Sequence, residues 1–81
     1  MRGEPVPMLK RGETVRLTFA GRTVDAFVAL ASPNGRSLFL MFDAVVGGYV
    51  GGLPLLWDGA AFREPFPDGR SAYIEHRTWV H

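Results

Sequence analysis

The chain has 81 residues, of which 47% are hydrophobic and 21% charged, with a formal net charge of +1 and no cysteine. This length predicts a single domain over residues 1–81, and the hydrophobic content excludes a chain that is disordered by composition. The absence of cysteine excludes disulfides and thiolate metal sites. The nearly balanced charge excludes a general electrostatic attraction to nucleic acid or anionic lipid.

The chain ends and the uncharged middle section predict no membrane segment. Residues 1–9 contain prolines and an acid but no hydrophobic stretch, so we expect an extended N-terminal segment rather than a signal peptide. The longest uncharged run, residues 44–57, is too short to cross a bilayer and is interrupted by glycines and Pro54. We expect residues 78–81 to fray at the C-terminus. A cytoplasmic protein with no membrane partner is the resulting prediction.

The first predicted hairpin joins residues 14–19 to residues 23–30. Residues 14–19 alternate polar and apolar side chains, which is typical of a half-buried strand. Gly21-Arg22 fits a two-residue type II′ turn, whose first position favours glycine because it needs a positive φ. The three predicted pairs, all on one face, are Phe19–Val24, Leu17–Ala26 and Val15–Val28.

The second predicted hairpin turns at Ser32-Pro33-Asn34-Gly35-Arg36. A type I′ turn at Asn34-Gly35 would require the N–H of Pro33 for pairing, and proline has none. A type I turn with Gly35 in the left-handed position of a G1 bulge fits instead. The predicted pairs are Leu30–Leu38, Val28–Leu40 and Ala26–Phe42, which extend the same apolar face.

The second half predicts further short strands. Glycines 47, 48, 51 and 52 surround Tyr49-Val50 and indicate bulges or barrel corners. Residues 53–57 form an apolar strand in which Pro54 requires an edge position or a bulge. Asp58-Gly59 predicts either a type I′ hairpin, which we favour, or the N-cap of a short helical turn. Residues 66–70 repeat the type I plus G1 pattern before a strand at 72–77.

These patterns predict an all-β fold with five to seven short strands and no helix, beginning with a three-stranded meander. Such a chain closes into a small antiparallel barrel or a roll, because closure removes exposed strand edges. The start of the first strand, Gly12-Glu13-Thr14-Val15, resembles that of many SH3-like barrels. This resemblance implies an SH3-like strand topology.

The face opposite the predicted core contains Arg16, Phe27, Phe39 and Met41, with Tyr49 at its periphery. Aromatic, Met and Arg side chains are enriched at the centres of protein interfaces. In one interpretation this face is exposed and binds a protein partner or a second copy, since a two-fold contact needs only one surface. In the other, the C-terminal strands or Tyr49 and Trp57 cover it as a second core layer.

A non-catalytic interaction or assembly module, with self-association into a homo-oligomer as one form, is therefore the predicted function. The alternative is a barrel that binds single-stranded nucleic acid, with Arg16, Arg22 and Arg36 on phosphates and Phe27 and Phe39 stacked on bases. The near-neutral charge and Asp25 on the same face argue against it.

No motif predicts an enzyme, a cofactor or a metal site. The glycines at 47–52 lack the helix and lysine of a phosphate-binding loop, so we interpret them as structural. His76 and His81 are five residues apart on a predicted strand and would point to opposite faces. Trp57 and Trp79 are expected to anchor the core.

Overall fold

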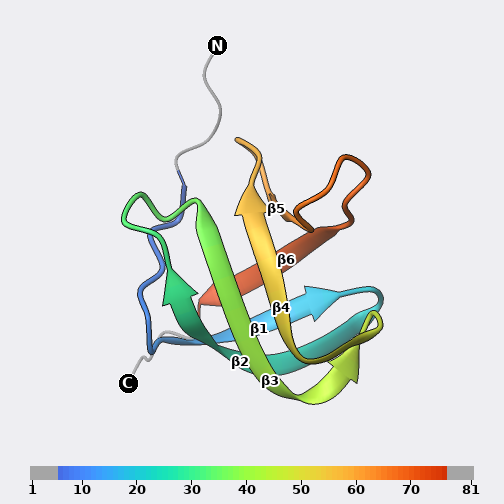
Figure 1. Cartoon of the computed structure of the whole chain (residues 1–81). Coiled ribbons are helices and arrows are strands. Elements are labelled where there is room, and N and C mark those ends of the chain that lie inside the picture. Colours follow the sequence, from blue (N-terminus) through green and yellow to red (C-terminus); the bar gives the residue numbers. More distant parts are fainter. Residues whose placement is uncertain (1–5, 77–81) are drawn as a thin grey trace.

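The computed structural model describes residues 6–76, which form a closed antiparallel barrel of six strands in sequential order (Figure 1). The strands are β1 (Thr14–Phe19), β2 (Arg22–Ala31), β3 (Ser37–Val46), β4 (Tyr49–Trp57), β5 (Phe62–Arg63) and β6 (Ser71–His76). Strand β6 returns to pair with β1 and closes the barrel. Residues 6–76 contain no helix. The all-β prediction is confirmed, and of the two predicted architectures the chain adopts the barrel.

Strands β3 and β4 cross β1 and β6 at a steep angle, and the curved strand β2 connects the two directions (Figure 1). The barrel closes between β4 and β6 only through the two-residue strand β5. Among residues 6–76, the first part of β4 therefore has no strand partner on the side away from β3. Pro54 lies in this part. The Trp57 N–H donates to Arg36 O and so points towards β3, and backbone nitrogens along β4 point alternately towards β3 and away from it. By that alternation the Pro54 nitrogen points to the unpaired side, so the predicted edge position is confirmed.

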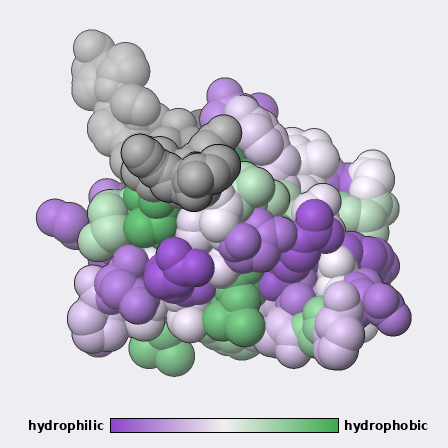
Figure 2. All heavy atoms as spheres, turned by 90° about the horizontal axis from the view of Figure 1, so that it is seen from above, coloured by the Kyte–Doolittle hydropathy of each residue, from purple (hydrophilic) through white to green (hydrophobic). Residues whose placement is uncertain are grey.

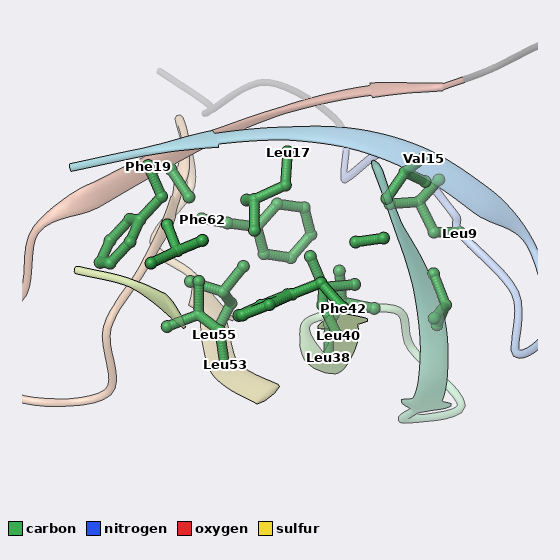
Figure 3. Close-up of a cluster of buried hydrophobic side chains, with 14 of the residues drawn as sticks. Leu9, Val15, Leu17, Phe19, Leu38, Leu40, Phe42, Leu53, Leu55 and Phe62 are labelled. Carbon is green, nitrogen blue, oxygen red and sulfur yellow. The ribbon is translucent and has the colours of Figure 1, made fainter. Parts of the chain in front are cut away.

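The core fills the barrel interior with apolar side chains from alternating positions. Val15, Leu17 and Phe19 of β1 face side chains of β3 and β4 across the interior (Figure 3). Trp57 and Phe62 join the same cluster with their rings edge to face, 5.0 Å between centroids. The Trp57 ring therefore anchors the core, as predicted. Trp79 lies outside the described residues.

The predicted register of the first hairpin is wrong by two residues. The turn is Ala20-Gly21, with φ of 50° and 80°, and Phe19 pairs with Arg22. This register forms two polar cross-strand contacts that the predicted one would lose. Thr18 Oγ1 lies 2.9 Å from Thr23 Oγ1, and Arg16 forms an ion pair with Asp25. Because a shift by two preserves strand faces, the predicted core positions still point inward.

The turn of the second hairpin is confirmed, but its register differs near the turn. The Gly35 N–H donates to Ser32 O at 2.9 Å, and Gly35 has a φ of 75°, as the type I plus left-handed glycine pattern predicts. Val28 pairs with Leu40 as expected, but a bulge after Val28 makes Leu30 pair with Phe39 rather than Leu38. Leu30 therefore points outward and is 60% exposed, which corrects its predicted core position.

Two turns in the second half differ in detail from the prediction. Asp58 begins a four-residue hairpin loop rather than a type I′ turn, and its carboxylate accepts the N–H groups of Ala60 and Ala61. The Gly69 N–H donates to Phe66 O, which confirms the predicted type I turn. Gly69 lacks the predicted left-handed conformation. A Cβ at Gly69 would overlap the Glu64 backbone, so close packing explains the glycine.

Candidate functional site

The outer face of β2 and β3 carries the most exposed aromatic–methionine pair of the predicted site. Phe27 lies between Thr14 on β1 and Met41 on β3, and Met41 lies next to Gly52 on β4. Phe27 is 45% and Met41 41% exposed. The predicted juxtaposition of Phe27 and Met41 is confirmed by this register. We call the outward side chains of Phe27, Leu30, Phe39 and Met41 the outer apolar face.

Phe39 belongs to this face but is less exposed than Phe27 and Met41, because its ring lies over Gly52. A Cβ on Gly52 would come within 2.6 Å of Phe39 Cζ. The absence of a side chain at Gly52 thus leaves the space that the Phe39 ring occupies. Leu30 is the direct cross-strand neighbour of Phe39 and widens the face beyond the predicted residues. The sequence does not predict Leu30 as part of this face, because the bulge that turns its side chain outward does not change the alternation of polar and apolar residues.

A shallow groove of about 430 Å³ opens beside Phe27 and Met41. Thr14, Asp25 and Asp43 complete its outer lining. Asp43 is exposed and forms no hydrogen bond or ion pair with residues 6–76. The groove therefore combines an apolar wall with carboxylates at one end.

Arg16 stands at the margin of the outer apolar face rather than opposite Phe27. Its direct neighbour is Asp25, and Arg16 Nε lies 3.6 Å from Asp25 Oδ1. Both side chains remain about half exposed or more, at 47% and 67%. Such an exposed pair is screened by solvent and contributes little to stability. Arg16 and Phe27 are thus close in the sheet, but the expected direct pairing between them is absent.

Tyr49 lies apart from the other predicted site residues. Its ring packs edge to face against the core side chain Phe19, with centroids 6.1 Å apart. Its hydroxyl donates to Glu64 Oε2 at 2.7 Å. Tyr49 therefore belongs to an internal polar network that fixes the loop between β5 and β6, and it does not extend the outer apolar face.

Glu64 is the centre of this network, which we call the Glu64 network. It is 7% exposed, yet it accepts from Arg70 Nε at 2.9 Å and Arg70 Nη2 at 3.0 Å. The Arg70 guanidinium also lies 4.8 Å from the centroid of the Phe19 ring. Hydrogen bonds from the Arg70 side chain and backbone, and from Tyr49, lower the pKa of Glu64 to about 2. The Tyr49 hydroxyl and the Arg70 Nε and Nη2 groups thus donate to internal partners, which is typical of a structural ion pair.

Tyr49 and Trp57 do not cover the outer apolar face, as the alternative interpretation expected them to do. Trp57 is 9% exposed and lies inside the barrel with the core cluster. Tyr49 also packs against that cluster. Strand β6 pairs edge to edge with β1 and extends the wall of the barrel. Within residues 6–76, Phe27 and Met41 therefore remain open to solvent.

The arginines of the nucleic-acid alternative do not form one basic surface. Arg22 begins β2 and donates to Val45 O at 2.8 Å. Arg36 follows β2 and donates to Trp57 O at 3.4 Å. Arg22 thus lies at one end of the ten-residue strand β2 and Arg36 beyond its other end, while Arg16 faces Asp25. These three arginines therefore do not form the single basic path that the nucleic-acid alternative expects of them.

The glycine cluster has structural roles at each of its positions. Gly47 and Gly48 form the tight turn between Val46 and Tyr49, with φ of 59° and 89°. Gly51 has a φ of 78° near a register shift in the pairing of β3 with β4. Gly52 accommodates the Phe39 ring. These roles account for the glycines without a bound phosphate.

Other exposed apolar side chains occur on the barrel: Val45 pairs with Val50 on β3 and β4, and Leu56 and Phe66 line a second groove of about 560 Å³. Neither group contains a methionine beside an aromatic ring. Seen from above, the end of the barrel presents hydrophobic side chains dispersed among polar ones (Figure 2). Among residues 6–76 no three His, Asp or Glu side chains are placed to hold a metal ion. His81 lies outside the described residues. No helix that could span a membrane occurs between residues 6 and 76.

Comparison with protein-family models, with curated proteins and with solved structures gives no match for this chain.

Proposed function

We propose that this barrel is a non-catalytic interaction module whose contact surface is the outer apolar face of β2 and β3. The observation that supports this most directly is the pairing of Phe27 with Met41, at 45% and 41% exposure, beside a groove of about 430 Å³. Contiguous exposed apolar side chains rimmed by polar ones mark binding surfaces. Aromatic and methionine side chains are the types that interface centres favour.

The size of the face indicates what it binds. A fully exposed aromatic side chain offers ~150–250 Å², so Phe27 and its few half-exposed neighbours offer on the order of a few hundred Å² in total. A stable protein interface takes about 800 Å² from each partner. A short segment of a protein partner suits this area better than a tight homodimer, and self-association through this face alone is expected to be weak.

An SH3-like topology is part of this proposal. The tight consecutive meander from β1 to β4 and the return of the last strand to β1 support it. Such a small closed barrel supplies a rigid wall on which a binding face can be presented.

A peptide-display selection tests the proposed function. The wild-type barrel is the target, and the Phe27→Asp variant, whose fold is checked by circular dichroism, is the counter-target. We expect peptides to be enriched on the wild type and not on the variant. Light scattering of the wild type from 20 μM to 1 mM, a range of about fifty-fold, measures self-association in parallel. The proposal fails if no peptide depends on Phe27 and the protein stays monomeric throughout.

A further inference from the structure

Two adjacent rows of side chains on β2 and β3 differ sharply in character. Phe27 and Met41 are direct cross-strand neighbours and form the apolar row. Asp25 precedes Phe27 by two residues and Asp43 follows Met41 by two, so both carboxylates lie at the same end of the groove. Two residues along a strand span about 7 Å. The groove therefore changes from apolar to acidic over that distance.

This distance matches the division of a basic side chain into stem and head. Arginine and lysine lay their methylene stems along apolar surface and keep the charged head in a polar environment. An aromatic ring at the wall attracts the cation further. Within the chain one carboxylate of the acidic row already has a guanidinium beside it, since Arg16 Nε lies 3.6 Å from Asp25 Oδ1.

We propose that the groove binds an arginine or lysine side chain of an extended partner peptide. The stem lies across Phe27 and Met41, and the charged head reaches Asp43. Asp43 is the principal carboxylate, since it forms no ion pair within residues 6–76, whereas Asp25 is shared with Arg16. This assignment rests on the proposed function and adds the chemistry of the partner.

A second copy of the chain is a poorer occupant of the same groove. Arg16 is the cation at the margin of this face, and it already forms an ion pair with Asp25, so a two-fold contact would bring no unpaired cation from it to Asp43. The few hundred Å² of exposed apolar surface also fall short of a stable dimer interface. Charge complementarity therefore favours a cationic peptide.

The test is a titration of the ¹⁵N-labelled full chain, followed by NMR. The probe is a capped hexapeptide, glycine-leucine-arginine-leucine-serine-glycine, compared with the same peptide carrying citrulline in place of arginine. Citrulline keeps the shape of arginine and removes the charge. We expect shifts at Phe27, Met41 and Asp43, and at least about threefold tighter binding of the arginine peptide, as an exposed ion pair supplies. Increasing salt should reduce this difference.

Matched variants assign the effect to Asp43. The Asp43→Asn variant should bind both peptides equally, whereas Asp68→Asn, which removes an exposed charge in the loop between β5 and β6, should keep the difference. Equal binding of both peptides by the wild type overturns the cation assignment but leaves the proposed function intact. Shifts confined to residues away from the groove overturn it as well. The cation assignment is also overturned if the wild type without peptide is dimeric through this face. It is overturned as well if a thymidine octamer binds more tightly than the arginine peptide.

Discussion

The tight turn between β3 and β4 offers a quantitative test of how this barrel is held together. Gly47 and Gly48 have φ of 59° and 89°, so alanine is strained at both. A Cβ on Gly47 would lie 2.5 Å from Phe19 Cε2, whereas a Cβ on Gly48 would meet nothing within 4 Å. The two substitutions therefore share the backbone strain and differ in the contact with Phe19.

The expected losses follow from this difference. An L-residue in the left-handed region costs about 1–2 kcal/mol, and the smaller conformational entropy of the unfolded alanine chain offsets about 0.4–1 kcal/mol of this cost. Overpacking a core adds about 1–3 kcal/mol. Phe19 is 1% exposed and is confined by Tyr49 and by the Arg70 guanidinium. Gly48→Ala should thus cost about 1 kcal/mol, and Gly47→Ala about 2–4 kcal/mol.

Urea denaturation followed by circular dichroism measures both free energies of unfolding. Equal losses for the two alanine variants would refute the tight packing of Phe19 against the turn. The difference should shrink when both substitutions are repeated in a Phe19→Leu background, because the smaller side chain leaves room for the new methyl group. A difference that stays constant in that background would place the clash elsewhere.

Three further predictions concern the Glu64 network and the β4 edge. The pKa of Glu64 is lowered from 4.5 to about 2, so its contribution to stability is present above about pH 4.5 and is lost as the pH falls towards 2. The urea midpoint of the wild type should fall over that range, and less steeply in Glu64→Gln. Tyr49→Phe should lower the free energy of unfolding by about 1 kcal/mol at pH 7. Pro54→Ala restores an N–H on the unpaired edge and should raise the mass measured by light scattering.

Strand faces could be predicted from the sequence because alternation depends only on whether a position is odd or even. The predicted register of the first hairpin was displaced by two residues, yet Leu17 and Ala26 still point inward. A displacement by one would have reversed them. The observed register can also be predicted from the sequence. It pairs Thr18 with Thr23 and Arg16 with Asp25, and polar or opposite-charge cross-strand pairs are favourable.

Leu30 could not be placed from the sequence in the same way. The turn after β2 closes with the Ser32 N–H donating to Ser37 O, which leaves one extra residue to be absorbed within β2. Where that bulge forms depends on how β2 curves between the two strand directions, and this follows from barrel closure rather than from local pattern. The outward position of the Leu30 side chain could therefore not be predicted from the sequence.

The Glu64 network also escaped prediction, because its members meet only in three dimensions. Tyr49 opens β4, while Glu64 and Arg70 lie on either side of the loop that follows β5. The sequence signals there, Pro67 and Gly69, indicated the turn but not which carboxylate it would enclose. The prediction that places Tyr49 at an interaction surface therefore depends on residue type alone.

The contrast between these two regions supports placing the contact function on β2 and β3. In the Glu64 network each charged group has an internal hydrogen-bond partner, and a new ligand would first have to break those bonds. At the groove, Asp43 has no ion pair within residues 6–76 and Phe27 and Met41 face solvent. Ligand binding there displaces only water from apolar surface and gains a charge contact. The free energy available for binding a partner is therefore larger at the groove than in the Glu64 network.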